Sequence, residues 1–79
     1  MAENEHTLDP GSWTDKYGDY LFHYAMVRLS DEQLASDLVQ DTFLAALKSR
    51  ERFRGDSSEK TWLTSILKRK IIDVYRRQG

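Results

Sequence analysis

Apolar residues recur at the spacing of an α-helix in three successive blocks, and this periodicity is the strongest constraint on the fold. The blocks cover residues 13–29, 31–50 and 58–77, and turn-forming or helix-capping residues separate them. No segment alternates apolar and polar residues in the manner of a half-buried strand. We therefore predict an all-α fold, a compact three-helix bundle with a recognition loop between the second and third helices.

The apolar stripes also define a candidate core. They comprise Trp13, Tyr17, Tyr20, Leu21, Tyr24, Ala25 and Leu29, then Leu34, Ala35, Leu38, Val39, Thr42, Ala45 and Ala46, and finally Leu63, Ile66, Leu67, Ile71 and Val74. Ser12, Ser30 and Asp56 each stand three positions before a carboxylate or a glutamine, which is the spacing of a helix-capping pair. We expect these three residues at the N-termini of the helices.

Residues 1–11 differ from the rest of the chain. They are polar, lack helical periodicity and contain the only proline, which precedes Gly11. We predict a disordered tail over residues 1–11 and a single folded domain over residues 12–79. A chain of 79 residues buries only a thin core, so a deep substrate cavity is not expected.

Composition narrows the classes of function. The chain has no cysteine and only two histidines, far apart in sequence, which argues against disulfides, thiol chemistry and a metal site. No nucleophile–base pair, carboxylate dyad or phosphate-cradling motif is present, so we expect no enzyme, no catalytic residue and no cofactor. The N-terminus lacks an apolar signal segment and no stretch is apolar enough to span a bilayer, which predicts a cytoplasmic protein without membrane association.

Charge is segregated along the chain. Residues 1–44 hold nine acidic and two basic side chains, a net charge of −7, whereas residues 45–79 hold ten basic and four acidic side chains, a net charge of +6. Chance clustering on a solvated surface is the simpler explanation. The alternative is a bipolar molecule, with one pole for a protein and the other for phosphate groups.

One non-core face of the second helix is acidic. On a helical wheel, the side opposite the apolar stripe carries Asp37, Gln40, Asp41 and Leu44, with Lys48 at its end. An exposed leucine among carboxylates suits a partner helix, because apolar contact provides affinity while charge fixes the register. A lone surface leucine on a solvated face is the competing interpretation.

The third helix has a basic face instead. Its non-core side carries Ser65, Lys68, Arg69, Ile72 and Arg76, with Trp62 and Asp73 at its margin and Arg77 beyond. Cations at one-turn spacing can follow a phosphate backbone, and an indole beside them can stack on an unpaired base. Trp62 also lies close enough to the apolar stripe to be an ordinary core aromatic.

The loop before the third helix follows a run of arginines. We expect its exposed tip to consist of Gly55, Asp56 and Ser57, next to Arg54. Backbone amides and hydroxyls in such a tip could read the edge of a flipped base. Phe53 is expected to fold partly beneath the loop as core.

Four sequence blocks stand out along the chain: DLVQDTFL at residues 37–44, RFRGD at 52–56, TWL at 61–63, and IID at 71–73 followed by Arg76 and Arg77. Together they resemble region 2 of the extracytoplasmic-function (ECF) sigma factors. They occur in the family's order and at its separations, and the resemblance covers residues 13–78. It implies a non-catalytic domain that acts in the initiation of bacterial transcription.

The resemblance also implies two partners. The second helix would bind the clamp helices of the β′ subunit of RNA polymerase core through Asp37, Gln40 and Asp41, with Leu44 beside them. The loop and third helix would open the promoter −10 element and hold a flipped base of the melted non-template strand. By resemblance and charge together, the DNA-binding residues are Phe53, Arg54, Gly55, Asp56, Ser57, Trp62, Lys68, Arg69, Asp73, Arg76 and Arg77. An anti-sigma factor is left open as a further partner.

The chain departs from the family pattern in two respects. Many relatives carry asparagine where this chain has Arg69, so we expect a phosphate contact there rather than a base-specific one. The family's usual C-terminal helix-turn-helix domain, which reads the −35 element, is not in these residues, and we expect the chain to be a fragment of a longer protein.

Two other functions fit the same charge pattern. One is a helix-turn-helix domain that reads paired DNA with its third helix, although the turn of that motif is only about three to four residues long. The other is a purely protein-binding helical module whose basic end meets an acidic partner.

Overall fold

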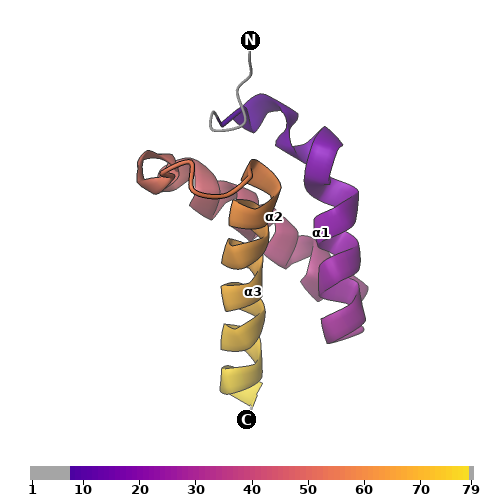
Figure 1. The fold of residues 1–79 in the computed structure, drawn as a ribbon. Coiled ribbons are helices and arrows are strands. Elements are labelled where there is room, and N and C mark those ends of the chain that lie inside the picture. Colours follow the sequence, from indigo (N-terminus) through magenta and orange to yellow (C-terminus); the bar gives the residue numbers. More distant parts are fainter. Residues whose placement is uncertain (1–7, 79) are drawn as a thin grey trace.

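Three α-helices form the fold in the computed structural model, which describes residues 8–78 (Figure 1). Helix α1 covers Trp13–Leu29, α2 covers Glu32–Lys48 and α3 covers Glu59–Gln78, with short 3-10 turns at Pro10–Ser12 and Arg50–Arg52. Figure 1 shows α1 and α3 running in the same direction, with α2 crossing behind them. The predicted all-α three-helix bundle is confirmed.

Two of the three helices differ from their predicted ranges at their ends. The first helix agrees with the predicted range, and the third begins and ends one residue later than predicted. The second helix, expected over residues 31–50, ends at Lys48 because the chain tightens into the 3-10 turn at Arg50–Arg52. The connection between α2 and α3 therefore spans residues 49–58.

Two helix caps lie one or two residues beyond the predicted positions. Ser12 makes no side-chain cap, and Ser30 ends α1 in a left-handed conformation with φ 54°. Asp31 caps α2 instead, where its carboxylate accepts a hydrogen bond from a backbone N–H three residues on, at 3.0 Å. At α3 the hydroxyl of Ser58, rather than Asp56, accepts the equivalent bond at 3.1 Å. Asp31 and Ser58 each lie next to another residue that could cap a helix, so the spacing of capping pairs alone could not identify the actual cap.

The core receives side chains from all three helices. Its buried apolar residues are Trp13, Leu21, Ala25, Ala35, Leu38, Val39, Ala46, Leu63, Ile66, Leu67 and Ile71. Every one of them belongs to a predicted stripe, so this part of the core prediction is confirmed. Tyr20 was also assigned to a stripe, but its side chain is 41% exposed. It lies at the edge of the stripe, where its ring faces the ammonium of Lys60 on α3 rather than the core.

A buried carboxylate joins the first turn of α3 to the start of α1. Glu59 is only 8% exposed, and its oxygens accept three hydrogen bonds. The donors are the indole N–H of Trp13 at 2.6 Å, the backbone N–H of Asp9 at 2.6 Å and the hydroxyl of Tyr17 at 3.0 Å. A buried carboxylate is tolerated only when it is satisfied in this way, and the positive end of the α3 dipole adds to its stability.

Tyr17 is affected by the same environment. Burial raises the pKa of its hydroxyl above the ordinary value, and the hydrogen bond to Glu59 and the nearby carboxylate charges act in the same direction. The Tyr17 hydroxyl therefore stays protonated and remains a donor to Glu59 at neutral pH.

Part of the predicted tail is ordered by this contact. Residues 8–11 were assigned to a disordered tail, but Leu8 packs against the core and the backbone of Asp9 is held by Glu59. Pro10 begins a 3-10 turn that leads into α1. The prediction of a disordered tail was wrong for residues 8–11. The hydrogen bond to Glu59 holds this segment, and the spacing of apolar residues cannot indicate such a bond. Residues 1–7 lie outside the described part of the chain.

The far ends of α1 and α3 are also joined by a polar contact. The hydroxyl of Tyr75, in α3, donates to the backbone carbonyl of Arg28 in the last turn of α1. Carbonyl groups in a last turn lack helical partners, so this bond satisfies one of them. The two helices are thus tied by hydrogen bonds at both ends, with the apolar core between.

Replacing the buried carboxylate tests its contribution to stability. We expect Glu59→Gln to lower the free energy of unfolding by about 2 kcal/mol, because an amide presents an NH₂ group to donors that need an acceptor. Glu32→Gln is the matched control, since Glu32 is an exposed glutamate in the first turn of α2. Urea unfolding followed by circular dichroism gives both values. Equal midpoints for the two variants would show that the charge and the second acceptor oxygen of Glu59 contribute nothing to stability.

Candidate nucleic-acid and protein interfaces

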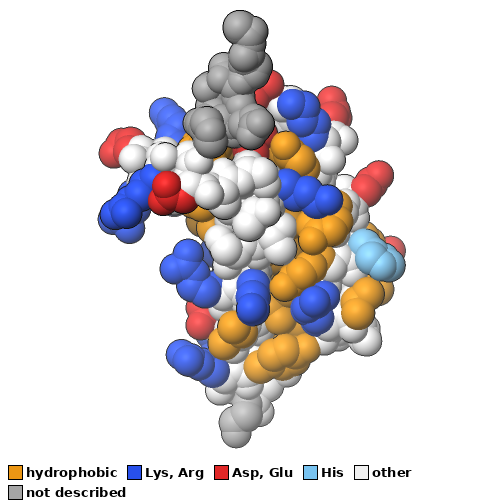
Figure 2. Space-filling model, in the orientation of Figure 1, with side chains coloured by type: hydrophobic (Ala, Val, Ile, Leu, Met, Phe, Trp, Pro, Cys, Tyr) orange, Lys and Arg blue, Asp and Glu red, His pale blue; other side chains and the backbone are white. Residues whose placement is uncertain are grey.

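The segregated charge of the sequence becomes two separate surfaces in the fold. Figure 2 shows lysine and arginine side chains distributed along the side of the molecule that carries α3 and the loop before it. The acidic side chains predicted to bind a partner lie on another helix, α2. The predicted acidic set and most of the predicted basic side chains therefore lie on different elements.

The acidic face of α2 is fully accessible. We use this name for Asp37, Gln40, Asp41 and Leu44, all of which are exposed. Leu44 is 55% exposed, and Leu47, one turn further along, is 39% exposed. The carboxylate of Asp37 accepts a hydrogen bond from the Gln33 side chain at 3.0 Å, which orders it on the helix surface. The four predicted residues thus share one exposed face with an apolar end.

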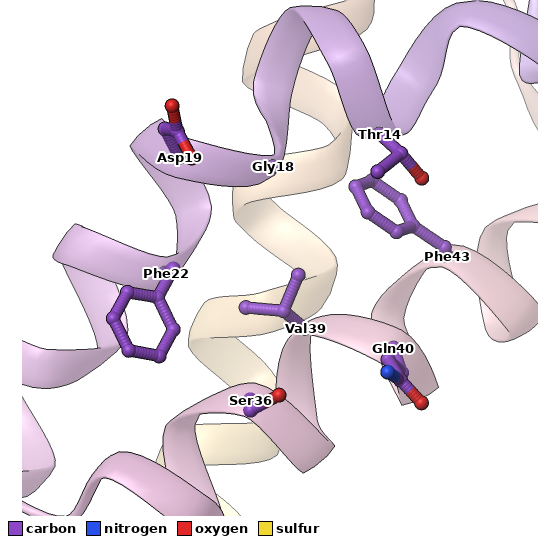
Figure 3. Close-up of a pocket in the computed structure, with 8 residues that line it drawn as sticks. All are labelled: Thr14, Gly18, Asp19, Phe22, Ser36, Val39, Gln40 and Phe43. Carbon is purple, nitrogen blue, oxygen red and sulfur yellow. The ribbon is translucent and has the colours of Figure 1, made fainter.

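A shallow groove adjoins the acidic face. It has a volume of about 290 Å³ and lies between α1 and α2, as Figure 3 shows. Its lining residues are Thr14, Gly18, Asp19, Phe22, Ser36, Val39, Gln40 and Phe43. Gln40 belongs to both the groove and the acidic face, so a partner on α2 would also meet α1.

The basic face of α3 is exposed along its whole length. We define it as Lys68, Arg69, Asp73, Arg76 and Arg77, all exposed in the structure. Trp62 lies fifteen positions before Arg77, so the predicted DNA-binding residues of α3 extend over about 22 Å of helix at the usual rise. An elongated surface of this kind suits an extended nucleic-acid strand better than a single small ligand.

A cluster of aromatic side chains packs between the loop and the core. The ring of Phe53 lies 5.1 Å from that of Trp62, and Trp62 lies 6.5 Å from Trp13. Trp13 in turn stacks on Phe43 of α2, with ring centroids 6.0 Å apart. Both Phe53 and Trp62 are half-buried. Trp62 therefore packs partly as a core aromatic and keeps some exposure to solvent, and its stacking on an unpaired base stays a prediction.

The tip of the loop is less exposed than expected. Asp56 and Arg54 are exposed, but Gly55 and Ser57 are only half-exposed. Gly55 has a φ of 80°, a left-handed conformation that favours glycine, so a side chain at this position would strain the turn. The tip lies directly before the first turn of α3. Phe53, which precedes the tip, packs against Trp62, so the tip lies close to that residue.

The fold also forms a second groove that sequence reasoning missed. It lies between α1 and α3 and is lined by Tyr20, Tyr24, Lys60, Thr61, Thr64, Ser65 and Lys68. Its rings and its cations come from different helices, so no pattern within a single helix indicates it.

Residues 8–78 contain no cluster of histidine, aspartate and glutamate that could hold a metal ion. None of the helices in that part of the chain combines the length and apolar character needed to cross a membrane.

Comparison with known proteins identifies the family. The model of the sigma-70 region 2 family matches residues 13–79. The chain is 45% identical over 56 residues to a probable RNA polymerase sigma factor of Haemophilus influenzae, an alignment that covers 71% of this chain and 29% of that protein. It is 38% identical over 64 residues to the ECF RNA polymerase sigma factor SigX of Bacillus subtilis, covering 81% of this chain and 33% of the relative.

A third relative gives the same result. The RNA polymerase sigma factor YlaC of Bacillus subtilis is 40% identical over 62 residues, which are 78% of this chain and 36% of YlaC. The chain thus spans about a third of the length of these relatives. No solved structure gives a significant match. The resemblance inferred from the four sequence blocks is confirmed: the chain belongs to the sigma-70 region 2 family and is of the ECF type.

Proposed function

We propose that this chain is a transcription initiation domain that binds two partners at once. The acidic face of α2 binds RNA polymerase core at the clamp helices of its β′ subunit. The loop and the basic face of α3 hold the melted non-template strand of the promoter −10 element. The proposal places the protein in the cytoplasm, where polymerase and promoters are found, and assigns it no cofactor and no catalytic step.

The observation that carries this proposal is the separation of the two charged surfaces on different helices. A partner on α2 leaves the loop and α3 uncovered, so protein and DNA need not compete. Complementary charge would steer the acidic face to a basic partner and keep it away from DNA. Exposed Leu44 would add apolar contact at the end of that face. Relatives named as sigma factors of RNA polymerase support the choice of partner.

The loop favours unpaired DNA over a duplex. The connection between α2 and α3 covers residues 49–58, longer than the turn of about three to four residues in a helix-turn-helix motif. The accessible part of Trp62 next to the loop offers a stacking surface, which only an unpaired base can use. This arrangement is the reason for ranking the duplex-reading alternative second.

The proposed mechanism relies on binding energy and involves no chemical reaction. Taking a base out of the duplex costs a few kcal/mol, and stacking on an aromatic ring returns about 1–3 kcal/mol per base. Phosphate contacts from Lys68, Arg69 and Arg76 would add affinity that depends on salt. The domain would therefore capture bases as the −10 duplex opens thermally, without driving the opening by itself.

An anti-sigma factor that covers the acidic face would block the binding of polymerase, since polymerase needs the same surface.

Charge reversal on α2 tests polymerase docking. We expect Asp37→Lys combined with Gln40→Lys to weaken binding to polymerase core by at least about thirty-fold, roughly 2 kcal/mol, because like charges would then face each other. The control is Asp15→Lys with Gln78→Lys, which makes the same change of charge at two exposed residues outside α2. Binding is measured by surface plasmon resonance, and circular dichroism verifies the fold. Equal affinity of the two double variants would refute the docking surface.

A comparison of DNA forms tests the strand-binding surface. Fluorescence anisotropy should give tighter binding to a −10 sequence with an unpaired bubble than to the same sequence fully paired. Arg54→Ala with Asp56→Ala should weaken bubble binding about ten-fold through loss of the loop contacts. Lys16→Ala with Asp15→Ala, a pair of equal net charge on α1, should leave it unchanged. Preference for paired DNA would favour the helix-turn-helix alternative, and no DNA binding at low salt would favour the protein-binding one.

A further inference from the structure

The groove between α1 and α3 has the chemistry of a single-strand binding site, although none of its tyrosines belongs to the predicted DNA-binding set. It has a volume of about 490 Å³ and opens on the side of the molecule seen in Figure 2, where basic and apolar side chains lie side by side. Among the described residues that line it, each charged side chain is a lysine. Sites for unpaired nucleic acid combine cations with aromatic surfaces in this manner.

The aromatic surface consists of two tyrosines of α1. Tyr20 and Tyr24 have ring centroids 6.3 Å apart, and the rings are tilted by 48°. The ammonium of Lys60 lies 4.1 Å from the Tyr20 centroid, and the guanidinium of Arg28 lies 3.5 Å from that of Tyr24. Both rings are thus covered by cations of the same chain. A ligand with a flat ring and a negative charge could take the place of Lys60 on Tyr20 and bind its ammonium as well.

Hydroxyl groups of α3 line the groove between the two lysines. Thr64 donates its hydroxyl proton to the backbone carbonyl of Lys60 at 2.7 Å, and Ser65 donates to that of Trp62 at 2.6 Å. Their oxygens therefore present lone pairs rather than protons to the groove. Acceptors of this kind suit the amino groups of nucleotide bases.

The groove is continuous with the strand-binding surface already described. Lys68 belongs to both the groove and the basic face. At the other end, the backbone N–H of Thr61 donates to the hydroxyl oxygen of Ser58, the residue that ends the loop. Lys60 and Lys68 are eight residues apart on α3, which separates them by about 12 Å along the helix. A strand that leaves the loop would meet Lys60 first and Lys68 about two turns later.

We propose that the groove between α1 and α3 is a second subsite for the unpaired DNA strand. One base stacks on Tyr20, and Lys60 and Lys68 bind phosphates on either side of it. Lys60 moves from the ring to a phosphate when the base enters. The inference rests on the proposed function, because the strand in the groove is the one that the loop holds.

Oligonucleotides of two lengths separate this subsite from the loop. The test uses the 79-residue chain and fluorescein-labelled single strands of about four and about twelve nucleotides, a range that covers common site sizes. Tyr20→Leu should weaken binding of the longer strand about ten-fold and leave the shorter strand, which the loop anchors, unchanged. Lys60→Met should reduce the magnitude of the salt slope of the longer strand by about 0.7, the value for one phosphate contact on a single strand.

Matched controls exclude general effects. His23→Leu changes another exposed ring on α1, and Lys48→Met removes an exposed lysine of α2. Both should bind each strand as the unchanged chain does, and circular dichroism verifies that every variant is folded. The loop variant Arg54→Ala with Asp56→Ala should weaken both lengths.

The outcomes distinguish the two proposals. If Tyr20→Leu and Lys60→Met bind the longer strand normally while the loop variant does not, the second subsite is overturned and the proposed function stands. If the loop variant binds both lengths normally, the proposed strand site in the loop fails. If the groove variants instead lose affinity for polymerase core with DNA binding intact, the groove binds a protein and the subsite is again overturned.

Discussion

A buried carboxylate at the first turn of α3 is the interaction on which the arrangement of the site depends. Glu59 accepts hydrogen bonds from the side chains of Trp13 and Tyr17 and from the backbone of Asp9, so the start of α1 is held against the start of α3. The loop joins α3 directly before this point. Because Trp13 also contacts Trp62, which supports the loop through Phe53, the network stabilises the base of the proposed DNA surface.

The charge separation follows from how the three helices share the core. Each helix places its apolar stripe inward, so its remaining faces are free to carry different charges. On α2 that free face is acidic, whereas α3 and the loop carry the basic side chains. A small bundle can therefore bind two unlike partners without an internal cavity, provided that the helices keep their relative positions. The contacts at Glu59 and at Tyr75 supply that rigidity at the two ends of α1 and α3.

Much of the fold could be predicted because helical periodicity is local. The buried apolar residues of α2 and α3 and the exposure of Asp37 and Leu44 follow from the repeat of the α-helix alone. Features that join separate segments could not be predicted in this way. Glu59 looks like an exposed first-turn glutamate in the sequence, and its burial depends on donors more than forty residues away. The groove beside Tyr20 likewise needs α1 and α3 to be placed together before it exists.

Formation of a ternary complex is the most direct test of the central claim, which is that the two surfaces act at the same time. A fluorescent unpaired −10 strand, polymerase core and the chain are mixed and sedimented together. The account predicts that the strand sediments with polymerase core only when the chain is present, because the chain connects the two. Sedimentation to the same extent without the chain would contradict it, as would a chain that binds either partner but never both.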